Sequence, residues 1–247
     1  MDLSAYVLLS QQQALRRQLD IAANNMANSS TVGFKREQPL FHEYVERADE
    51  AAVDAAKNTS FVLDYGAIHD TAQGAFQATG RPLDVMIEGP GYLSVETAEG
   101  GVAYTRAGFV KVLETGELGT AQGLKFLGED GRPIAVPADQ AARLTISEDG
   151  TVLGPQGAVG RLAVSRFDDE NALSPRGDGM MIGDGARTLA AQETKFKTGG
   201  VEGSNVQPIV ETTAMVEILR SYQASQRMAE SINDMRRQAI EKLGRAR

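Results

Sequence analysis

The side chains most often used in catalysis and metal binding are scarce in this sequence. Its 247 residues include no cysteine and two histidines, His42 and His69. Neither histidine has the helically spaced His, Asp or Cys partners from which a metal site is built. A hydrolase needs a histidine or a paired carboxylate in a cleft as its base, and no serine nucleophile elbow appears. We therefore expect no catalytic residue, no metal and no cofactor, and the sequence does not indicate an enzyme.

Two other patterns associated with ion binding also lack the required spacing. The acidic run Asp168-Asp169-Glu170 does not alternate its oxygen ligands as a calcium loop does, so we interpret it as a solvated turn. The glycine-rich segments join predicted strands, whereas a phosphate-binding loop opens a helix and carries Gly-Lys-Ser/Thr. Residues 37–209 contain fourteen basic and twenty-six acidic side chains. This acidic middle disfavours nucleic acid as a partner, because such a partner requires a basic surface.

One stretch near the N-terminus carries amide side chains in a regular pattern. Asn24, Asn25 and Asn28 share one helical face because they are three and four residues apart. A solvated helix face normally carries Glu, Lys or Arg. Amide groups instead suit a surface that loses water and forms hydrogen bonds with a neighbour. The next residues are poor helix formers that end in Gly33, so the helix should stop there.

Long helices are predicted at both ends of the chain. Residues 3–28 place apolar side chains on a heptad seam that no Gly or Pro interrupts, and residues 209–243 repeat them at a spacing of three and four. Ser204 or Asn205 is a candidate cap before the second helix, and Pro208 is tolerated at its start. The seams consist of Ala5, Leu8, Leu15, Leu19, Ala22 and Met26 in the first helix and Met215, Ile218, Tyr222, Ala229, Ile232, Ala239 and Leu243 in the second.

Between the helices the pattern changes to short strands. Apolar runs follow one another with turn pairs such as Asp130-Gly131 and Asp149-Gly150 between them, and no helical period intervenes. Such a pattern indicates an antiparallel sandwich or barrel. The predicted strands cover residues 84–88, 92–97, 102–106, 108–113, 116–119, 124–127, 134–136, 144–147, 151–153 and 162–167.

Residues 36–75 are weakly patterned and are expected to form an extended connector. Within them, residues 43–56 are acidic and prone to helix, so we expect a short helix or a solvated arm there. Residues 67–80 are small, polar and punctuated by glycine, which favours an extended chain.

The stretch 23–35 resembles the N-terminal signature of the bacterial flagellar rod and hook proteins. That signature consists of Asn-Asn, an aliphatic residue, Ala-Asn, two variable residues, Thr, one variable residue, Gly, an aromatic residue and Lys. Every fixed position is filled here, from Asn24-Asn25 through Asn28 and Thr31 to Gly33-Phe34-Lys35. A dozen residues in fixed spacing make the resemblance specific.

The resemblance covers nearly the whole chain and is weakest at residues 36–75 and 168–195. Arg220-Ser221-Tyr222 matches an Arg-x-Tyr of the family, although the Asn that often follows that Tyr is missing. Four more segments match the family's opening β-hairpin, its next strand, its Gly-rich turn and the Glu-x-Ser-Asn-Val before its last helix, namely residues 82–92, 104–109, 128–137 and 202–206.

The resemblance implies an α+β fold, in which coiled-coil-like terminal helices pair and a central antiparallel β sandwich or barrel-like domain lies between them in the sequence. The helices would build the inner tube of an axial filament, and the β domain its outer layer. The implied parts are an N-terminal helix of the axial core domain at 1–35, an extended connector at 36–75, a β domain at 76–205 and the C-terminal helix of the core domain at 206–247.

The implied function is that of a structural subunit of the flagellar rod, a hollow drive shaft that transmits torque and conducts exported subunits. Its partners would be other rod proteins, copies of itself and the flagellar type III export apparatus, with no nucleic acid. It would lie in the periplasmic rod of the basal body. The expected assembly interface consists of Leu8, Leu15, Leu19, Asn24, Asn25, Met26, Asn28, Thr31, Gly33, Phe34, Lys35, Ser204, Asn205, Val206, Met215, Ile218, Tyr222 and Ile232.

Within the family, residues 6–10 and 15–17 look more like a proximal rod protein, and a distal rod or hook-type axial protein is the alternative. Outside the family, the rivals are a soluble binding module and a trimeric stalk adhesin. An adhesin needs an export signal, and no apolar run follows a basic patch at the N-terminus. We therefore expect export without a cleavable signal peptide. No stretch approaches ~20 uninterrupted apolar residues, so no membrane span is expected.

Overall fold

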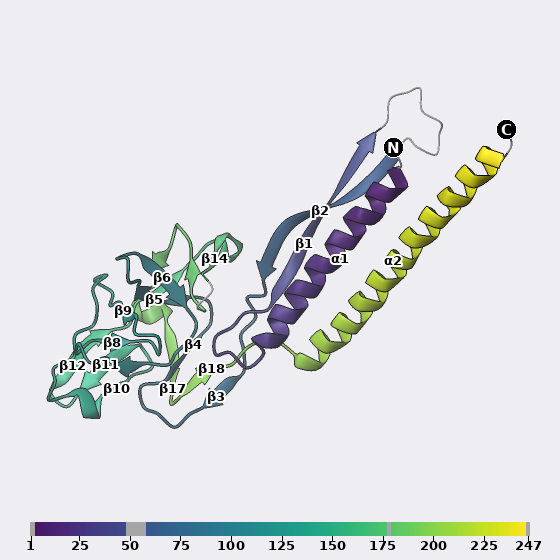
Figure 1. Ribbon diagram of the computed structural model, residues 1–247. Helices are drawn as coiled ribbons and strands as arrows, with labels where there is room; N and C mark the ends of the chain where they lie inside the picture. The colour runs from purple at the N-terminus through teal and green to yellow at the C-terminus, as the bar shows by residue number, and fades with distance from the viewer. Residues whose placement is uncertain (1–2, 48–57, 177–178, 246–247) are drawn as a thin grey trace. The chain divides into compact units, whose positions relative to one another are not determined.

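The computed structural model describes residues 3–47, 58–176 and 179–245 (Figure 1). The chain forms two compact units. We call the first the helical unit, which consists of Met1–Ala27, Glu37–Ile68 and Gln207–Arg247. We call the second the β unit, which consists of Asn28–Arg36 and His69–Val206. The chain is therefore α+β, as the sequence predicts, with helices at both ends and antiparallel sheets between them in sequence.

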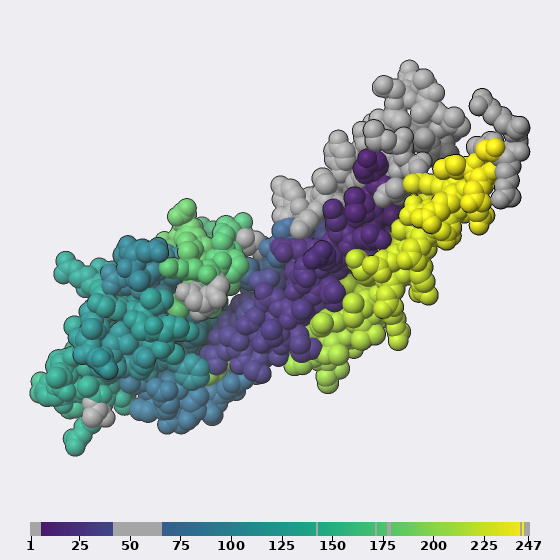
Figure 2. All heavy atoms as spheres, viewed as in Figure 1, coloured from purple at the N-terminus to yellow at the C-terminus, as the bar shows by residue number. Residues whose placement is uncertain are grey.

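The helical unit is built around two helices, α1 (Leu3–Ala27) and α2 (Pro208–Arg245). Both lie within a residue or two of their predicted bounds, because an uninterrupted apolar seam specifies a helix locally. Pro208 is the first residue of α2, a position where its missing N–H costs nothing. The two helices pack side by side and run in opposite directions (Figures 1 and 2).

The helical unit also contains two strands that the sequence does not predict. These are β1 (Glu37–Arg47) and β2 (Asn58–His69), which pair in a two-stranded sheet, and β1 packs against α1. Of the short helix or solvated arm expected over residues 43–56, the helix does not form at residues 43–47, which belong to β1, and residues 48–57 lie outside the described chain. Pairing with a second strand overrides the weak helix propensity of these residues.

The β unit is all antiparallel in its described pairings. A nine-stranded sheet has the order β14-β15-β6-β5-β9-β8-β7, and β13 joins β5 to β16. A three-stranded sheet is formed by β10, β11 and β12, and two smaller ladders pair β17 with β4 and β18 with β3. Of the expected sandwich or barrel, the strand order of the described residues does not show a closed barrel.

The bounds of these strands show where the sequence pattern succeeds. The predicted runs coincide with β4 to β11 and β13 apart from end residues, except that residues 134–136 contribute an isolated bridge at Ala135 rather than a strand. The strands are β3 (Phe76–Ala78), β4 (Val85–Glu88), β5 (Tyr92–Glu96), β6 (Val102–Thr105), β7 (Lys111–Val112), β8 (Leu118–Gly119), β9 (Lys125–Phe126), β10 (Thr145–Ile146), β11 (Thr151–Gly154), β12 (Gly157–Arg161), β13 (Val164–Arg166), β14 (Ser174–Pro175), β15 (Met181–Ile182), β16 (Arg187–Thr188), β17 (Lys195–Thr198) and β18 (Gly200–Glu202).

One apolar core stabilises the β unit. Val95, Val110, Leu118, Phe126 and Val152 are fully shielded from solvent at its centre. A second, aromatic cluster lies around Phe167, whose ring meets those of Tyr92 and Tyr104 edge to face. Among the described helices, none is long and apolar enough to cross a membrane.

Candidate functional site at the meeting point of the terminal motifs

The motifs at residues 23–35 and 202–206 meet at one buried carboxylate, that of Glu202. Its Oε1 accepts hydrogen bonds from Lys35 Nζ at 2.7 Å and from the Gly74 N–H at 2.9 Å. Its Oε2 accepts one from Arg106 Nη1 at 3.2 Å. Glu202, Lys35 and Arg106 are 1%, 2% and 5% exposed. We call this cluster the Glu202 junction; it is too deeply buried to contact a substrate.

Backbone contacts place these side chains. Glu202 is the last residue of β18 and faces Phe76 across the ladder with β3. Its carbonyl accepts a hydrogen bond from the Gly33 N–H at 2.8 Å, so the signature runs alongside the end of β18. Gly33 has φ +71°, and a Cβ at this position would lie 2.5 Å from the carbonyl carbon of Arg106. Only glycine fits, both because of this φ and because of the close approach.

The charges at the Glu202 junction are balanced by a second carboxylate. The Arg106 guanidinium lies 5.1 Å from the centre of the Tyr92 ring, and the Tyr92 hydroxyl donates to Glu170 Oε2 at 3.2 Å. Burial raises the pKa of Tyr92, and the negative charge of Glu170 acts in the same direction. Burial also lowers the pKa of Lys35, which Glu202 opposes. Two buried cations thus share the Glu202 carboxylate, and the half-buried carboxylate of Glu170 lies beyond Tyr92, in a setting where an unpaired charge would be costly.

Asn205 of the Glu-x-Ser-Asn-Val motif ties the signature to the chain after β2. Its Oδ1 accepts from the Arg36 N–H at 2.7 Å, and its Nδ2 donates to the carbonyls of Asp70 and Ala72 at 2.9 and 3.0 Å. Of the two candidate caps, Asn205 therefore bonds distant backbone instead. Ser204 Oγ accepts from the Val206 N–H at 3.2 Å.

Of the asparagines predicted to bond a neighbour, Asn25 does so within the helical unit. It is 1% exposed and pairs with the backbone of Glu37 through both amide atoms, each at 2.8 Å. Asn24 is exposed, and Asn28 is half-buried and accepts from the Thr31 hydroxyl at 3.1 Å. The three amides thus differ in environment although they share a helical face.

The remaining predicted site residues are buried, half-buried or, in one case, exposed. Lys35 and Val206 are buried, and Thr31 is exposed. Half-buried in the single chain are Leu8, Leu15, Leu19, Met26, Gly33, Phe34, Ser204, Asn205, Met215, Ile218, Tyr222 and Ile232. The structure brings the motif residues 33–35 and 202–206 together in the β unit, and the helix seams lie in the helical unit.

Sequence reasoning missed three charged residues that complete these contacts. Glu202 and Arg106 lie within the matched motifs but were not predicted as site residues, and Glu211 in the first turn of α2 is 1% exposed. The available signal was a single carboxylate, Glu202, between Gly200 and Gly203. Small neighbours allow other backbone segments to approach closely, as the Gly33 and Gly74 N–H groups approach Glu202 here.

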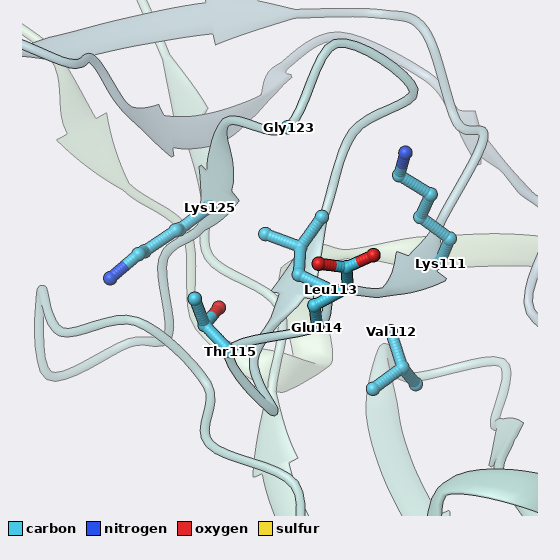
Figure 3. Close-up of a pocket in the computed structure, with 7 residues that line it drawn as sticks. All are labelled: Lys111, Val112, Leu113, Glu114, Thr115, Gly123 and Lys125. Atoms are coloured by element: carbon cyan, nitrogen blue, oxygen red, sulfur yellow. The ribbon is translucent and has the colours of Figure 1, made fainter.

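A hollow of ≈ 390 Å³ beside β7 is the other candidate for binding (Figure 3). Its two lysines point in different directions, and both already donate within the protein. Lys111 Nζ donates to the Ala121 carbonyl at 3.1 Å and Lys125 Nζ to Glu117 Oε1 at 2.8 Å. In the described part of the chain, no group of three or more His, Asp or Glu side chains is placed to bind a metal ion.

Comparison with known families agrees with the motifs. Residues 6–35 match the family model described as flagella basal body rod protein. Residues 86–154 match the flagellar hook protein FlgE/F/G D1 domain, and residues 197–242 match the flagellar basal body rod FlgEFG protein C-terminal region. The first and third matches contain the two motifs that meet in the β unit.

Relatives match over the full length. The flagellar basal-body rod protein FlgF of Caulobacter vibrioides is 36% identical over 99% of both chains. The chain belongs to the flagellar basal-body rod protein family. FlgF of Escherichia coli is 30% identical over 95% of each chain, and FlgG of Caulobacter vibrioides is 31% identical over 88% of this chain and 90% of its own. The flagellar basal-body rod protein family is structural and not enzymatic, and within it FlgF of Caulobacter vibrioides, at 36% identity, matches better than FlgG of the same organism, at 31%.

Proposed function

We propose that this chain is a FlgF-like structural subunit of the flagellar basal-body rod. It polymerises through its terminal helices into the hollow shaft that transmits torque and conducts exported subunits. The observation that carries the proposal is the match to FlgF over 99% of both chains, which includes both terminal motifs. Its partners are other rod proteins and further copies of itself. A distal rod or hook-type role is the second candidate, and the lower identity of the FlgG relative, 31% against 36% for FlgF of the same organism, favours it less.

The proposed assembly surface is formed by α1 and α2, paired in a coiled-coil-like manner. Seam residues such as Leu19 and Ile232 are only half-buried in the single chain, so further burial by a neighbour would stabilise them. Several apolar side chains of α2 are exposed as well, which supports contact with other subunits. They are Ile209, Val210, Val216, Leu219, Met228, Met235 and Ile240.

The buried members of the predicted interface have a different proposed role. Asn25, Lys35 and Val206 are shielded within one chain, so they act by positioning the exposed residues. On this proposal residues 1–35 and 206–247 form the axial core domain, residues 36–75 connect and residues 76–205 form the outer β domain. On the same proposal, the subunit reaches the periplasmic rod through the flagellar type III export apparatus.

The test is complementation of a strain from which the gene is deleted. We expect the deletion to abolish swimming, and the full chain to restore swimming and to be found in purified basal bodies in the fraction that contains the rod. A tagged chain restoring motility but found in the hook fraction would favour the hook-type role. Unchanged motility of the deletion strain, with no chain in basal bodies, would contradict both roles.

A further inference from the structure

Asn25 has an unusual set of contacts for a residue near the end of a helix. It lies two residues before the end of α1 at 1% exposure, near the buried Ile21 and Ala22 in sequence. Its Oδ1 accepts from the Glu37 N–H, and its Nδ2 donates to the Glu37 carbonyl, each at 2.8 Å. The side-chain amide therefore pairs with the first residue of β1 as a neighbouring strand would, at both its donor and its acceptor.

The same amide also reaches the second helix. Asn25 Nδ2 lies 3.5 Å from Glu211 Oε2, and Glu211 is itself 1% exposed in the first turn of α2. One side chain near the end of α1 thus contacts the start of β1 and the start of α2, all within the helical unit. Apolar seam residues such as Leu19 and Ile218 tolerate a shift of one helix along another, since dispersion contacts have no direction. A buried amide does not, because a shift leaves its hydrogen-bonding groups unpaired.

We propose that Asn25 is a positioning residue that sets the register of α1 against β1 and α2. A single buried asparagine in an apolar seam is known to specify register at some cost in stability. The proposal rests on the proposed function in one respect: a fixed register gives every rod subunit the same helical face for its neighbours. The ligand of Asn25 is the chain's own backbone at Glu37, so the effect is measurable in the purified subunit.

The experiment is a distance measurement between the two helices in the full chain. The chain has no cysteine, so Gln13→Cys and Gln223→Cys introduce two nitroxide labels at exposed positions of α1 and α2 without competing thiols. We expect one narrow distance distribution for the otherwise unaltered chain. Asn25→Leu should retain its helix content but give a distribution about twice as wide, or a second peak shifted by about one helical turn of 5.4 Å.

The matched control is Asn24→Leu, the same change at the exposed neighbouring position. It should leave the width unchanged. Asn25→Asp retains the size and the acceptor for the Glu37 N–H but has no donor, so its width should lie between those of the original chain and Asn25→Leu. Asn25→Asp also tests the proposal if Asn25→Leu does not fold.

Equal widths for the original chain and both Asn25 variants would overturn the proposal, whether those widths are narrow or broad. A lower melting temperature with an unchanged distribution would assign Asn25 a role in stability alone and would also overturn it. Neither result depends on where the chain resides in the cell, so failure here is distinguishable from failure of the rod assignment. The complementation test, which compares swimming of the deletion strain with and without the full chain, tests the rod assignment separately.

Discussion

At the scale of single residues, the Glu202 junction concentrates more charge than any other buried cluster described here. The Glu202 carboxylate accepts hydrogen bonds from Lys35, Arg106 and the Gly74 N–H. Because both cations are almost fully shielded, their desolvation is offset by that carboxylate and by two backbone carbonyls, that of Ala72 for Lys35 and that of Gly89 for Arg106. The two terminal motifs are therefore coupled through one anion. Its loss would leave the buried charges of Lys35 and Arg106 without their carboxylate.

Glu202→Gln should lower the free energy of unfolding of the β unit by about 3–5 kcal/mol, since Lys35 and Arg106 lose their shared anion. Urea titration followed by circular dichroism measures the loss. Glu193→Gln is the matched control, because its partner Arg187 is 61% exposed and the change should cost about 0.5 kcal/mol or less. Similar losses in the two variants would show that the junction contributes no more than a surface ion pair.

Gly33→Ala tests the close approach of the signature to Arg106. The positive φ alone should cost about 1–2 kcal/mol. Overlap with the Arg106 backbone should add at least ~1 kcal/mol. Gly80→Ala isolates the first term, because Gly80 has φ +72° and nothing within 4 Å of the added Cβ. Unfolding free energies measured for both should differ by the steric term, and equal costs would remove the special role of Gly33.

The raised pKa of Tyr92 should make the stability of the folded chain depend on pH in the alkaline range. Burial and Glu170 raise its pKa above the ordinary value of 10.0 in the folded chain. Above pH 10.0 the unfolded chain therefore releases this proton while the folded chain retains it, so stability is present below that pH and is lost as pH rises. Unfolding free energies between about pH 9 and 11.5 should fall less steeply for Tyr92→Phe. Equal slopes would mean that Tyr92 ionises equally well in both states.

At the scale of elements, α2 differs from the strands in how little it buries. Of its described residues only Glu211 and Ser225 are buried, and its seam from Met215 to Ile232 is half-buried. Strands such as β5 are shielded along most of their length within the single chain. A helix with apolar side chains on more than one face gains stability when further helices cover them, as the proposed rod assembly would do.

Asp at a seam position should therefore impair assembly. Leu19→Asp in α1 and Ile232→Asp in α2 place a charge where the proposed assembly removes water. Each should weaken subunit association by at least ~1.4 kcal/mol, or about ten-fold, and reduce swimming in the complemented strain. Gln11→Asp and Asn233→Asp add the same charge at exposed positions of the same helices and should swim normally. Normal swimming of both seam variants would count heavily against helix-mediated assembly.

At the scale of the whole molecule, the two units differ in their internal support. The β unit has a continuous apolar core around Val95, Leu118 and Phe126, all 0% exposed. The buried apolar side chains described in the helical unit are Ile21 and Ala22. Since burial supplies most of the stabilising free energy, local opening should begin in the helical unit.

Hydrogen exchange of the purified subunit should rank the units in that order. Amides of α1 and α2 should exchange at least ~10-fold faster than those of β5 and β6. Mass spectrometry of peptides from each element measures this in one experiment, and peptides covering residues 118–126 serve as the protected reference. Equal protection of α2 and β5 would mean that the helical unit is stable without neighbours.

The sequence by itself determined the elements whose information is local. The helices α1 and α2 follow from an apolar period that continues over many turns, and most of the strands β4 to β13 follow from short apolar runs between turn residues. The terminal motifs were sufficient to indicate the family. The sequence did not indicate an enzyme, and the family to which the chain belongs is structural.

Tertiary structure alone decided which of those residues meet. Glu202 lies 167 residues from Lys35 and 96 from Arg106, and no local pattern encodes a contact at such separation. The strands β1, β2 and β18 escaped prediction for the same reason, since a ladder partner rather than an apolar period holds each in place. Asn25 and Asn24 are adjacent and chemically identical, yet one is buried and the other exposed. The helix pattern placed both on a polar face, and only the packing of β1 and α2 selected Asn25 for burial.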